Sequence, residues 1–191
     1  MTEIDPLSAE PTNWFVITGP PSAGKTSVIE ALRQRGHPVV AETARQYIAS
    51  LGRSPSEIAA DPALQRRIQH EISALQAQAE DRLAPAETVF LDRALPDSMA
   101  YFRQLSLPTD ELVQRSTRFR YRQIFFLEGL PFANDGLRFE RVEEAMQLAD
   151  HIISAYVELG YAPIRVPVFD QLEPAASVAE RVTHILQRST A

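Results

Sequence analysis

The sequence contains no cysteine, and this absence removes several classes of protein at once. It excludes a disulfide scaffold, a cysteine-ligated zinc site, an iron–sulfur cluster and a thiol nucleophile in this 191-residue chain. Acidic side chains outnumber basic ones by 25 to 19, so the net charge of −6 has the wrong sign for a general nucleic-acid binder. No apolar run approaches the roughly 18 residues that cross a bilayer, and residues 1–13 carry no basic-then-apolar signal. We therefore expect a cytoplasmic protein without a transmembrane segment.

Lysine is nearly absent too: of the 19 basic residues, the only lysine is Lys25. It lies in a segment that fits the phosphate-loop pattern of glycine, four residues, glycine, lysine, and serine or threonine. That segment is Gly19, Pro20, Pro21, Ser22, Ala23, Gly24, Lys25 and Thr26. Glycine lets the backbone approach a phosphate closely, and the helix that follows presents free amides to the anion. The segment predicts ATP binding, with Lys25 reaching the β- and γ-phosphates and the Thr26 hydroxyl holding Mg²⁺.

Apolar segments alternate with amphipathic segments along the chain. Strands are expected at residues 14–18, 38–41, 88–92, 123–127 and 163–169. Helices are expected at residues 26–35, 42–51, 61–83, 96–104, 109–116, 139–159 and 175–188. This alternation predicts an α/β fold in which a mostly parallel sheet is covered by helices on both faces. Residues 1–13 are expected to be a flexible tail and residues 14–191 a single domain, with a ligand crevice at the carboxyl ends of the strands.

The end of the third expected strand narrows the type of phosphate-loop protein. Asp92 ends this strand, where a carboxylate beside Thr26 can hold Mg²⁺; the alternative is that it caps the next helix. Arg93 follows it instead of a second acid, which argues against a translocating ATPase. The guanine-binding motif Asn-Lys-x-Asp needs a second lysine, which the chain lacks. Phosphoryl transfer to a small acceptor remains, or slow hydrolysis used as a switch.

Two further groups are candidates for the chemistry of transfer. Glu42 follows the second strand and could take a proton from the acceptor hydroxyl, with Arg45 one turn behind it. The alternative for this pair is an exposed ion pair of little energetic value. Arg138 and Arg141 lie at the start of the long helix and could close over the phosphates as a lid. Their alternative is a pair of solvated charges at a helix start.

A basic stretch supplies the second hypothesis. It consists of Arg115, Arg118, Arg120 and Arg122, with Phe119 and Tyr121 interleaved. As a surface for RNA or anionic phospholipid, it would make the protein a nucleotide-dependent binding module with slow ATPase or GTPase activity. The alternative, which we favour, is that the aromatic residues pack into the protein and the arginines face solvent.

Taken together, the phosphate loop, Glu42-x-x-Arg45, the segment from Leu91 through Asp97 to Tyr101, and Asp135-Gly-x-Arg138 resemble one P-loop group. This group includes the nicotinamide riboside kinase domain of NadR-type proteins, an insect photoreceptor trafficking protein that binds GTP and phosphoinositide, and many predicted ATPases. The resemblance covers about residues 14–188. The pair Asp92-Arg93 is more similar to deoxynucleoside kinases than to the riboside kinase.

The resemblance implies a kinase-like fold with a five-stranded parallel sheet in the order 2-3-1-4-5 and a small helical lid. It implies that Lys25, Thr26 and Asp92 serve ATP and Mg²⁺. It places Glu42 and Arg93 on the acceptor side and Arg138 in the lid. We group Arg45 and Asp97 with the substrate residues and Arg141 with the lid. The sequence thus predicts an ATP-dependent, kinase-like phosphotransferase with a nucleoside-like or other small hydroxyl acceptor.

Overall fold

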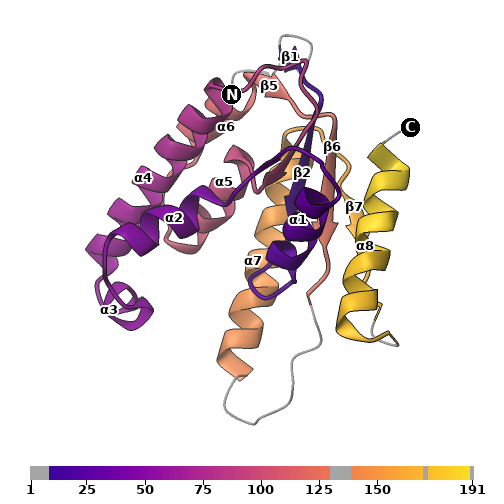
Figure 1. The fold of residues 1–191 in the computed structure, drawn as a ribbon. Coiled ribbons are helices and arrows are strands. Elements are labelled where there is room, and N and C mark those ends of the chain that lie inside the picture. The colour runs from indigo at the N-terminus through magenta and orange to yellow at the C-terminus, as the bar shows by residue number, and fades with distance from the viewer. Residues whose placement is uncertain (1–8, 130–138, 170–171, 190–191) are drawn as a thin grey trace.

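Five parallel strands form the central sheet of the computed structural model, which describes residues 9–129, 139–169 and 172–189 (Figure 1). The strands are β2 (Trp14–Thr18), β3 (Val39–Val40), β4 (Val89–Asp92), β6 (Gln123–Leu127) and β7 (Ile164–Val166). Their spatial order is β3-β4-β2-β6-β7, with every neighbouring pair parallel. Numbered along the chain within this sheet, the order is 2-3-1-4-5. The predicted α/β class with a parallel sheet is confirmed.

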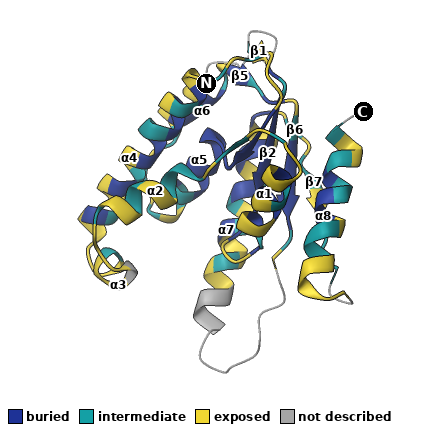
Figure 2. Cartoon of the chain, in the orientation of Figure 1, coloured by how far each residue is buried: buried dark blue, intermediate teal, exposed yellow. Residues whose placement is uncertain are grey.

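Helices cover both faces of the sheet because β2 is apolar on both sides. Trp14 and Val16 pack in one cluster with residues of α5 (Leu95–Gln104) and α7 (Phe139–Glu158). Phe15 and Ile17 point to the opposite face and pack against α1 (Lys25–Gln34) and α8 (Pro174–Ser189). All five residues of β2 are buried, as expected for the central strand of a parallel sheet. Figure 2 shows the buried strands between helices whose outer faces are exposed.

The remaining helices lie to one side of the sheet. They are α2 (Thr43–Ser50), α3 (Pro55–Ala59), α4 (Pro62–Asp81) and α6 (Asp110–Ser116) (Figure 1). Leu64, Ile68 and Ile72 line one stripe of α4 and pack with residues of α2 and α3. Helices α2 and α4 therefore lie together beside the carboxyl edge of the sheet.

Helix α3 was not expected from the sequence, although its start carries a recognisable signal. The Ser54 hydroxyl accepts the Glu57 amide at 3.2 Å, and the Glu57 carboxylate accepts the Ser54 amide at 2.7 Å. This reciprocal capping box satisfies amides that the first turn leaves free. The start of α4 follows the prediction, because Asp61 accepts the Leu64 amide at 3.0 Å and Pro62 occupies the first helical position.

The end of the expected N-terminal tail contains a short strand that the sequence analysis did not expect. Residues Glu10–Pro11 form β1, which pairs in parallel with β5 (Phe119–Arg120) as a separate two-stranded sheet. Glu10 and Thr12 each donate a backbone hydrogen bond of 2.9 Å to the β5 segment, and Thr12 is buried. Pairing with a segment more than 100 residues away leaves no local periodicity, which is why the sequence did not reveal it. Residues 1–8 of the expected tail lie outside the described residues.

The basic stretch packs largely against the protein itself. Phe119 and Tyr121 are buried, and the ring of Phe119 lies 4.8 Å from that of Trp14. The guanidinium of Arg120 donates to the carbonyls of Leu159 and Gly160 at 2.9 and 2.7 Å. Arg118 forms an ion pair of 2.6 Å with Asp81, and Arg122 donates to Asn13 at 3.4 Å. These contacts favour the packing interpretation over a surface for RNA or lipid.

None of the helices in the described part of the chain is long and apolar enough to cross a bilayer.

Candidate active site

The phosphate loop connects β2 to α1 and has three residues in the left-handed region of backbone space. Their φ angles are 142° at Gly19, 62° at Ser22 and 78° at Gly24. A Cβ atom on Gly19 would lie 2.4 Å from the carbonyl oxygen of Leu127, at the end of the neighbouring strand β6. The loop is therefore packed so closely on the sheet edge that only glycine fits at its first position. Lys25 begins α1, directly after the N-cap residue Gly24.

The side chain of Lys25 is folded back over this loop. Its ammonium group donates hydrogen bonds to the carbonyl oxygens of Gly19 at 2.9 Å and Pro20 at 2.7 Å. Burial, followed by repulsion from Arg93, lowers the pKa of Lys25 to about 7. A buried ammonium next to the free amides of a helix start is suited to an anionic partner.

Asp92 supplies a carboxylate at the same edge of the sheet, where it is paired in register with Ile17. Its Oδ1 atom is buried and has no hydrogen-bond partner among the described residues. Burial and the nearby Glu42 carboxylate raise the pKa of Asp92 to about 6, and Lys25 is close enough to oppose this shift. An unpartnered carboxylate oxygen fits a cation that prefers oxygen ligands.

Thr26 offers a second oxygen in the first turn of α1, where its hydroxyl accepts a 3.1 Å hydrogen bond from Arg45. Within the described residues, no group of three or more His, Asp or Glu side chains forms a metal site. Mg²⁺ commonly takes one or two protein oxygens and fills its other positions with water and phosphate. Asp92 and Thr26 therefore fit Mg²⁺ bound together with a nucleotide.

A buried ion-pair network lies beside Asp92. Arg93 donates through Nε to Glu42 at 3.0 Å and through Nη1 to Asp97 at 2.9 Å. The guanidinium also lies 5.6 Å from the ring centre of Tyr101. Arg93 has a φ angle of 71°, and its amide donates to the Ile17 carbonyl at 3.1 Å. The strained backbone turns this residue back toward the central strand, which places its side chain between the two carboxylates.

Asp97 joins this network from the first turn of α5, and it also lines the cavity beside the network. It is 2% exposed and accepts hydrogen bonds from four donors. These are the hydroxyl of Thr18, the guanidinium of Arg93, the amide of Ala94 and the hydroxyl of Tyr156. The sequence grouped Asp97 with the substrate residues, which stays a prediction; its contacts also hold Arg93 in place.

Glu42 connects this network to a second arginine, Arg45. One oxygen of Glu42 accepts from Arg93, and the other lies 3.4 Å from Nε of Arg45. Since Arg45 also donates to Thr26, it links the start of α2 to the start of α1. Glu42, Arg45 and Thr26 were expected to meet at the crevice, and the structure brings them together.

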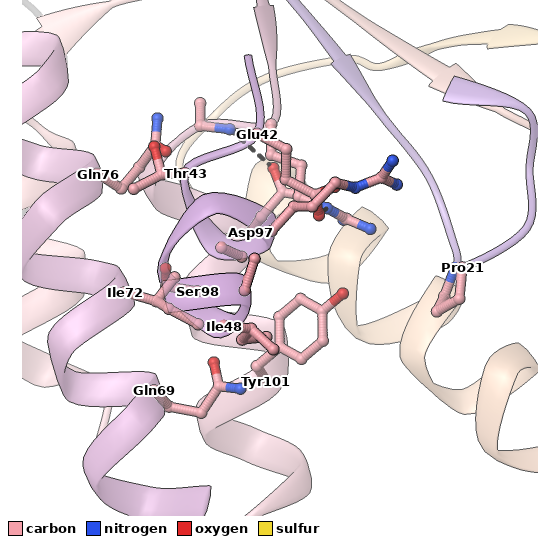
Figure 3. A pocket seen from close by; sticks show the side chains of 15 residues that line it. Pro21, Glu42, Thr43, Ile48, Gln69, Ile72, Gln76, Asp97, Ser98 and Tyr101 are labelled. Carbon is pink, nitrogen blue, oxygen red and sulfur yellow. Dashed lines mark hydrogen bonds and ion pairs between the residues drawn. The ribbon is translucent and has the colours of Figure 1, made fainter. Parts of the chain in front are cut away.

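A cavity of about 790 Å³ opens next to this network (Figure 3). Its walls come from the phosphate loop, the start of α2, one face of α4 and the first turns of α5. Glu42 and Arg93 lie at one part of the lining, whereas Ile48, Ile72 and Tyr101 give apolar surface. The cavity is large enough for a nucleoside-sized molecule.

Several residues at the site were missed by the sequence analysis. Gln69, Gln76, Ser98 and Tyr101 line the cavity from α4 and α5. Gln69 and Gln76 lie outside the motifs, because their positions depend on how two helices pack. Ser98 and Tyr101 lie in the segment from Leu91 to Tyr101 that carried the resemblance, but the sequence analysis assigned them no role. The predicted lid cannot be placed: Arg138 lies outside the described residues, and Arg141 lies in α7 but its side chain is not described.

Arg181 of α8 is a further residue that the sequence analysis missed. It is 2% exposed and donates to three carbonyl oxygens at the carboxyl edge of the sheet. These belong to Ala23 of the phosphate loop at 2.6 Å, Glu128 at 2.9 Å and Pro167 at 2.9 Å. The available signal was its position on the apolar stripe of α8, between Val178 and Val182.

A family model described as "AAA domain" matches residues 14–174. The chain belongs to this AAA-domain family. No curated protein sequence matches the chain.

Solved structures show which folds this member of the AAA-domain family is similar to. A NadR structure in complex with NR has 19% sequence identity and a TM-score of 0.63, over 95% of this chain and 50% of the other. A second, with NAD and AMP-PNP, has 20% identity and a TM-score of 0.60, over 94% and 50%. Deoxyadenosine kinase from M. mycoides, with dCMP and dCDP, has 15% identity and a TM-score of 0.56, over 92% and 97%. The chain thus spans about half the length of the NadR chains and shares the fold of P-loop kinases.

Proposed function

We propose that this protein transfers the γ-phosphate of ATP to a hydroxyl group of a small, nucleoside-like acceptor. One observation carries the proposal: the phosphate loop and a 790 Å³ cavity meet at the same edge of the sheet, with Glu42 and Arg93 in the cavity lining. A hydrolase needs only water beside the γ-phosphate, whereas a transferase needs a site for a second molecule. The cavity supplies that site.

On the nucleotide side, Lys25 and the amides of residues 22–26 bind the β- and γ-phosphates. Lys25 exchanges its two loop carbonyls for phosphate oxygens. Thr26 and Asp92 hold Mg²⁺, which neutralises charge on the phosphates when it is bound. Arg181 keeps the loop in place through the Ala23 carbonyl.

On the acceptor side, Glu42 accepts the proton of the acceptor hydroxyl. The hydroxyl oxygen forms a bond to the γ-phosphorus, the bond from that phosphorus to the bridging oxygen breaks, and ADP leaves. Arg93 orients the hydroxyl and stabilises negative charge that develops during transfer. The lid role of Arg138 and Arg141 stays a prediction from the sequence: if they close over the phosphates, they would exclude water from the transfer.

The fold comparisons support this proposal. NadR binds NR in one solved structure and NAD with AMP-PNP in another, and a deoxyadenosine kinase shares the fold. Thymidylate kinase from Ehrlichia chaffeensis is similar at a TM-score of 0.56 over 93% of this chain and 98% of the other. The names and bound ligands of these proteins are of nucleosides or nucleotides, and a cavity of about 790 Å³ has room for a molecule of that size.

Incubation with γ-labelled ATP, Mg²⁺ and a panel of nucleosides and vitamin ribosides tests the proposal. We expect label in a phosphorylated acceptor and little free phosphate when the right acceptor is present. Label released only as free phosphate with every acceptor would contradict a kinase and indicate a hydrolase.

A further inference from the structure

We infer that the acceptor cavity selects a molecule with an N–H hydrogen-bond donor on its ring and that Gln76 reads this donor through its carbonyl oxygen. The inference rests on the proposed function, because it takes the cavity as the acceptor site. It assigns Gln76 as a specificity-determining residue and Glu80, one turn further along α4, as the positioning residue that fixes its orientation.

Gln76 lies on the face of α4 that lines the cavity, in line with Ile72 and Gln69 (Figure 3). Its side chain is almost fully buried, at 5% exposure. The amide nitrogen Nε2 donates to Oε1 of Glu80 at 2.9 Å. In the part of the chain that the structure describes, Oε1 of Gln76 has no hydrogen-bond partner. The nitrogen of this buried amide is thus hydrogen-bonded, whereas its oxygen is free to accept a hydrogen bond from a ligand in the cavity.

The orientation of this amide is fixed by chemistry as well as by geometry. Oε1 of Glu80 also accepts the backbone amide of Leu95 at 2.8 Å, and Oε2 lies 2.7 Å from the Tyr121 hydroxyl. A backbone N–H can only donate, so Oε1 of Glu80 is an acceptor whether the carboxyl group is charged or neutral. If the Gln76 amide were reversed, its oxygen would face that acceptor. The carbonyl oxygen of Gln76 therefore remains on the cavity side in both states.

Glu80 is well placed to hold Gln76 because it is itself held. It is 3% exposed and is fixed by three donors from α4, α5 and the segment after β5. Gln69 provides a contrast on the same helix face, since its amide has no hydrogen-bond partner among the described residues and can turn either way. Gln69 can turn either its oxygen or its NH₂ group toward a ligand, whereas the carbonyl oxygen of Gln76 stays at the cavity and can meet only a donor.

The chemistry of the cavity then defines the ligand. In the ligand that we infer, the hydroxyl group contacts Glu42 and Arg93, and the apolar body contacts Ile48 and Ile72. An amino or carboxamide N–H of this ligand donates to Gln76. A molecule of the same shape without the N–H would leave the carbonyl oxygen of Gln76 buried and unpaired. Sites built to bond a polar group reject analogues that lack it far more strongly than apolar pockets reject a missing methylene.

Two matched pairs of ribosides test the inference: 3-carboxamide against 3-acetyl pyridinium riboside, and 6-aminopurine riboside against purine riboside. We measure kcat/KM with ATP and, in parallel, the Kd of each riboside by calorimetry without ATP. The wild type should prefer the N–H member by about 10- to 100-fold in at least one pair. In Gln76→Leu the preference should fall to within about threefold, whereas Gln69→Leu, the matched control, should retain it.

Glu80→Gln tests the positioning step. Glutamine at position 80 can present either an oxygen or an NH₂ group, so it no longer dictates the orientation of Gln76. We expect the preference for the N–H member to shrink while kcat for that member changes little. A purely structural role would lower both members of each pair equally.

The outcomes separate this inference from the proposed function. Preferential binding of the N–H members without any phosphorylation would contradict the kinase proposal and leave the donor selectivity standing. Equal kcat/KM or Kd within both pairs, or a preference that survives in Gln76→Leu, would overturn the inference. Failure of all four ribosides to bind at millimolar concentration would overturn it too.

Discussion

The two halves of the proposed site are built in different ways. The nucleotide side is a single backbone loop of eight residues, held on the sheet edge and served by one lysine. The acceptor side is a set of side chains from α2, α4 and α5 that are separated by up to 59 positions in the chain, from Glu42 to Tyr101. The first half depends on backbone geometry and binds what all nucleoside triphosphates share. The second depends on side chains and can change its ligand by substitution without disturbing the loop.

Each half also has its own buried support. Arg181 holds the phosphate loop through backbone carbonyls, and Asp97 holds Arg93 through a charge-assisted hydrogen bond. Neither support is expected to touch the reacting atoms. If the two halves are independent, substitutions on one side should change the binding of one substrate and leave the other intact.

The largest expected effect comes from Lys25→Ala. Removing the ammonium takes away the positive charge at the γ-phosphate, and we expect kcat to fall by about 10³-fold or more. The Kd of the acceptor, measured by calorimetry without ATP, should stay within about twofold, since Lys25 does not line the cavity.

Lys25→Arg is the informative control for that experiment. Two carbonyl oxygens at 2.9 and 2.7 Å form a compact site for a point charge. A planar guanidinium does not fit this geometry, so arginine should not restore activity. Wild-type turnover in either variant would show that Lys25 does not serve the transferred phosphate.

Glu42→Gln should have the next largest effect. A general base contributes about 10²- to 10⁴-fold, so kcat should fall within this range while the Kd of ATP is unchanged. The side-chain oxygen of the glutamine can still accept the hydrogen bond from Arg93. We therefore expect the variant to fold, although the charge of the ion pair is lost. Single-turnover kinetics with labelled ATP provide the measurement. If the variant phosphorylates acceptor at the wild-type rate, Glu42 is not the base.

The contrast between the halves also explains what the sequence could predict. The phosphate loop is contiguous, and its residue types are each required by the contact with phosphate, so the motif located Lys25 and Thr26 directly. The order of the strands in the central sheet was predicted correctly from the resemblance to the P-loop group. Asp92, Arg93 and Glu42 were found because they follow strands, and the carboxyl ends of parallel strands share one edge.

The features that were missed depend on contacts between distant segments. Strand β1 exists only because β5 offers it hydrogen bonds, and Gln76 is a cavity residue only because α4 packs beside α5. Arg181 differs, since an arginine on the apolar stripe of α8 was visible in the sequence. A charged residue at such a position indicates a buried partner, and its three carbonyl partners come from three separate loops.

Asp97→Ala tests the support on the acceptor side. It leaves Arg93 buried with a single carboxylate partner and removes acceptors from Thr18 and Tyr156. Breaking one partner of a buried ion pair costs about 3–5 kcal/mol, so the free energy of unfolding should fall by about that amount. Asp97→Asn keeps the volume and some of the hydrogen bonds, and should lose less. Denaturant unfolding measures both, and equal stability of Asp97→Ala and the wild type would exclude this support role.

The smallest of these effects on transfer is expected from Arg181→Met, which tests the support on the nucleotide side. Methionine fills part of the space but frees the carbonyls of Ala23, Glu128 and Pro167 from their shared donor. The phosphate loop would then sample more conformations before ATP binds, and we expect the KM for ATP to rise about tenfold. In Arg181→Lys, the ammonium group can reach at most part of the three carbonyls. We therefore expect its KM for ATP to lie between those of the wild type and Arg181→Met. The acceptor KM should not change in either variant, because Arg181 does not line the cavity. A parallel rise in both KM values would mean that the two halves of the site are coupled through the sheet rather than independent.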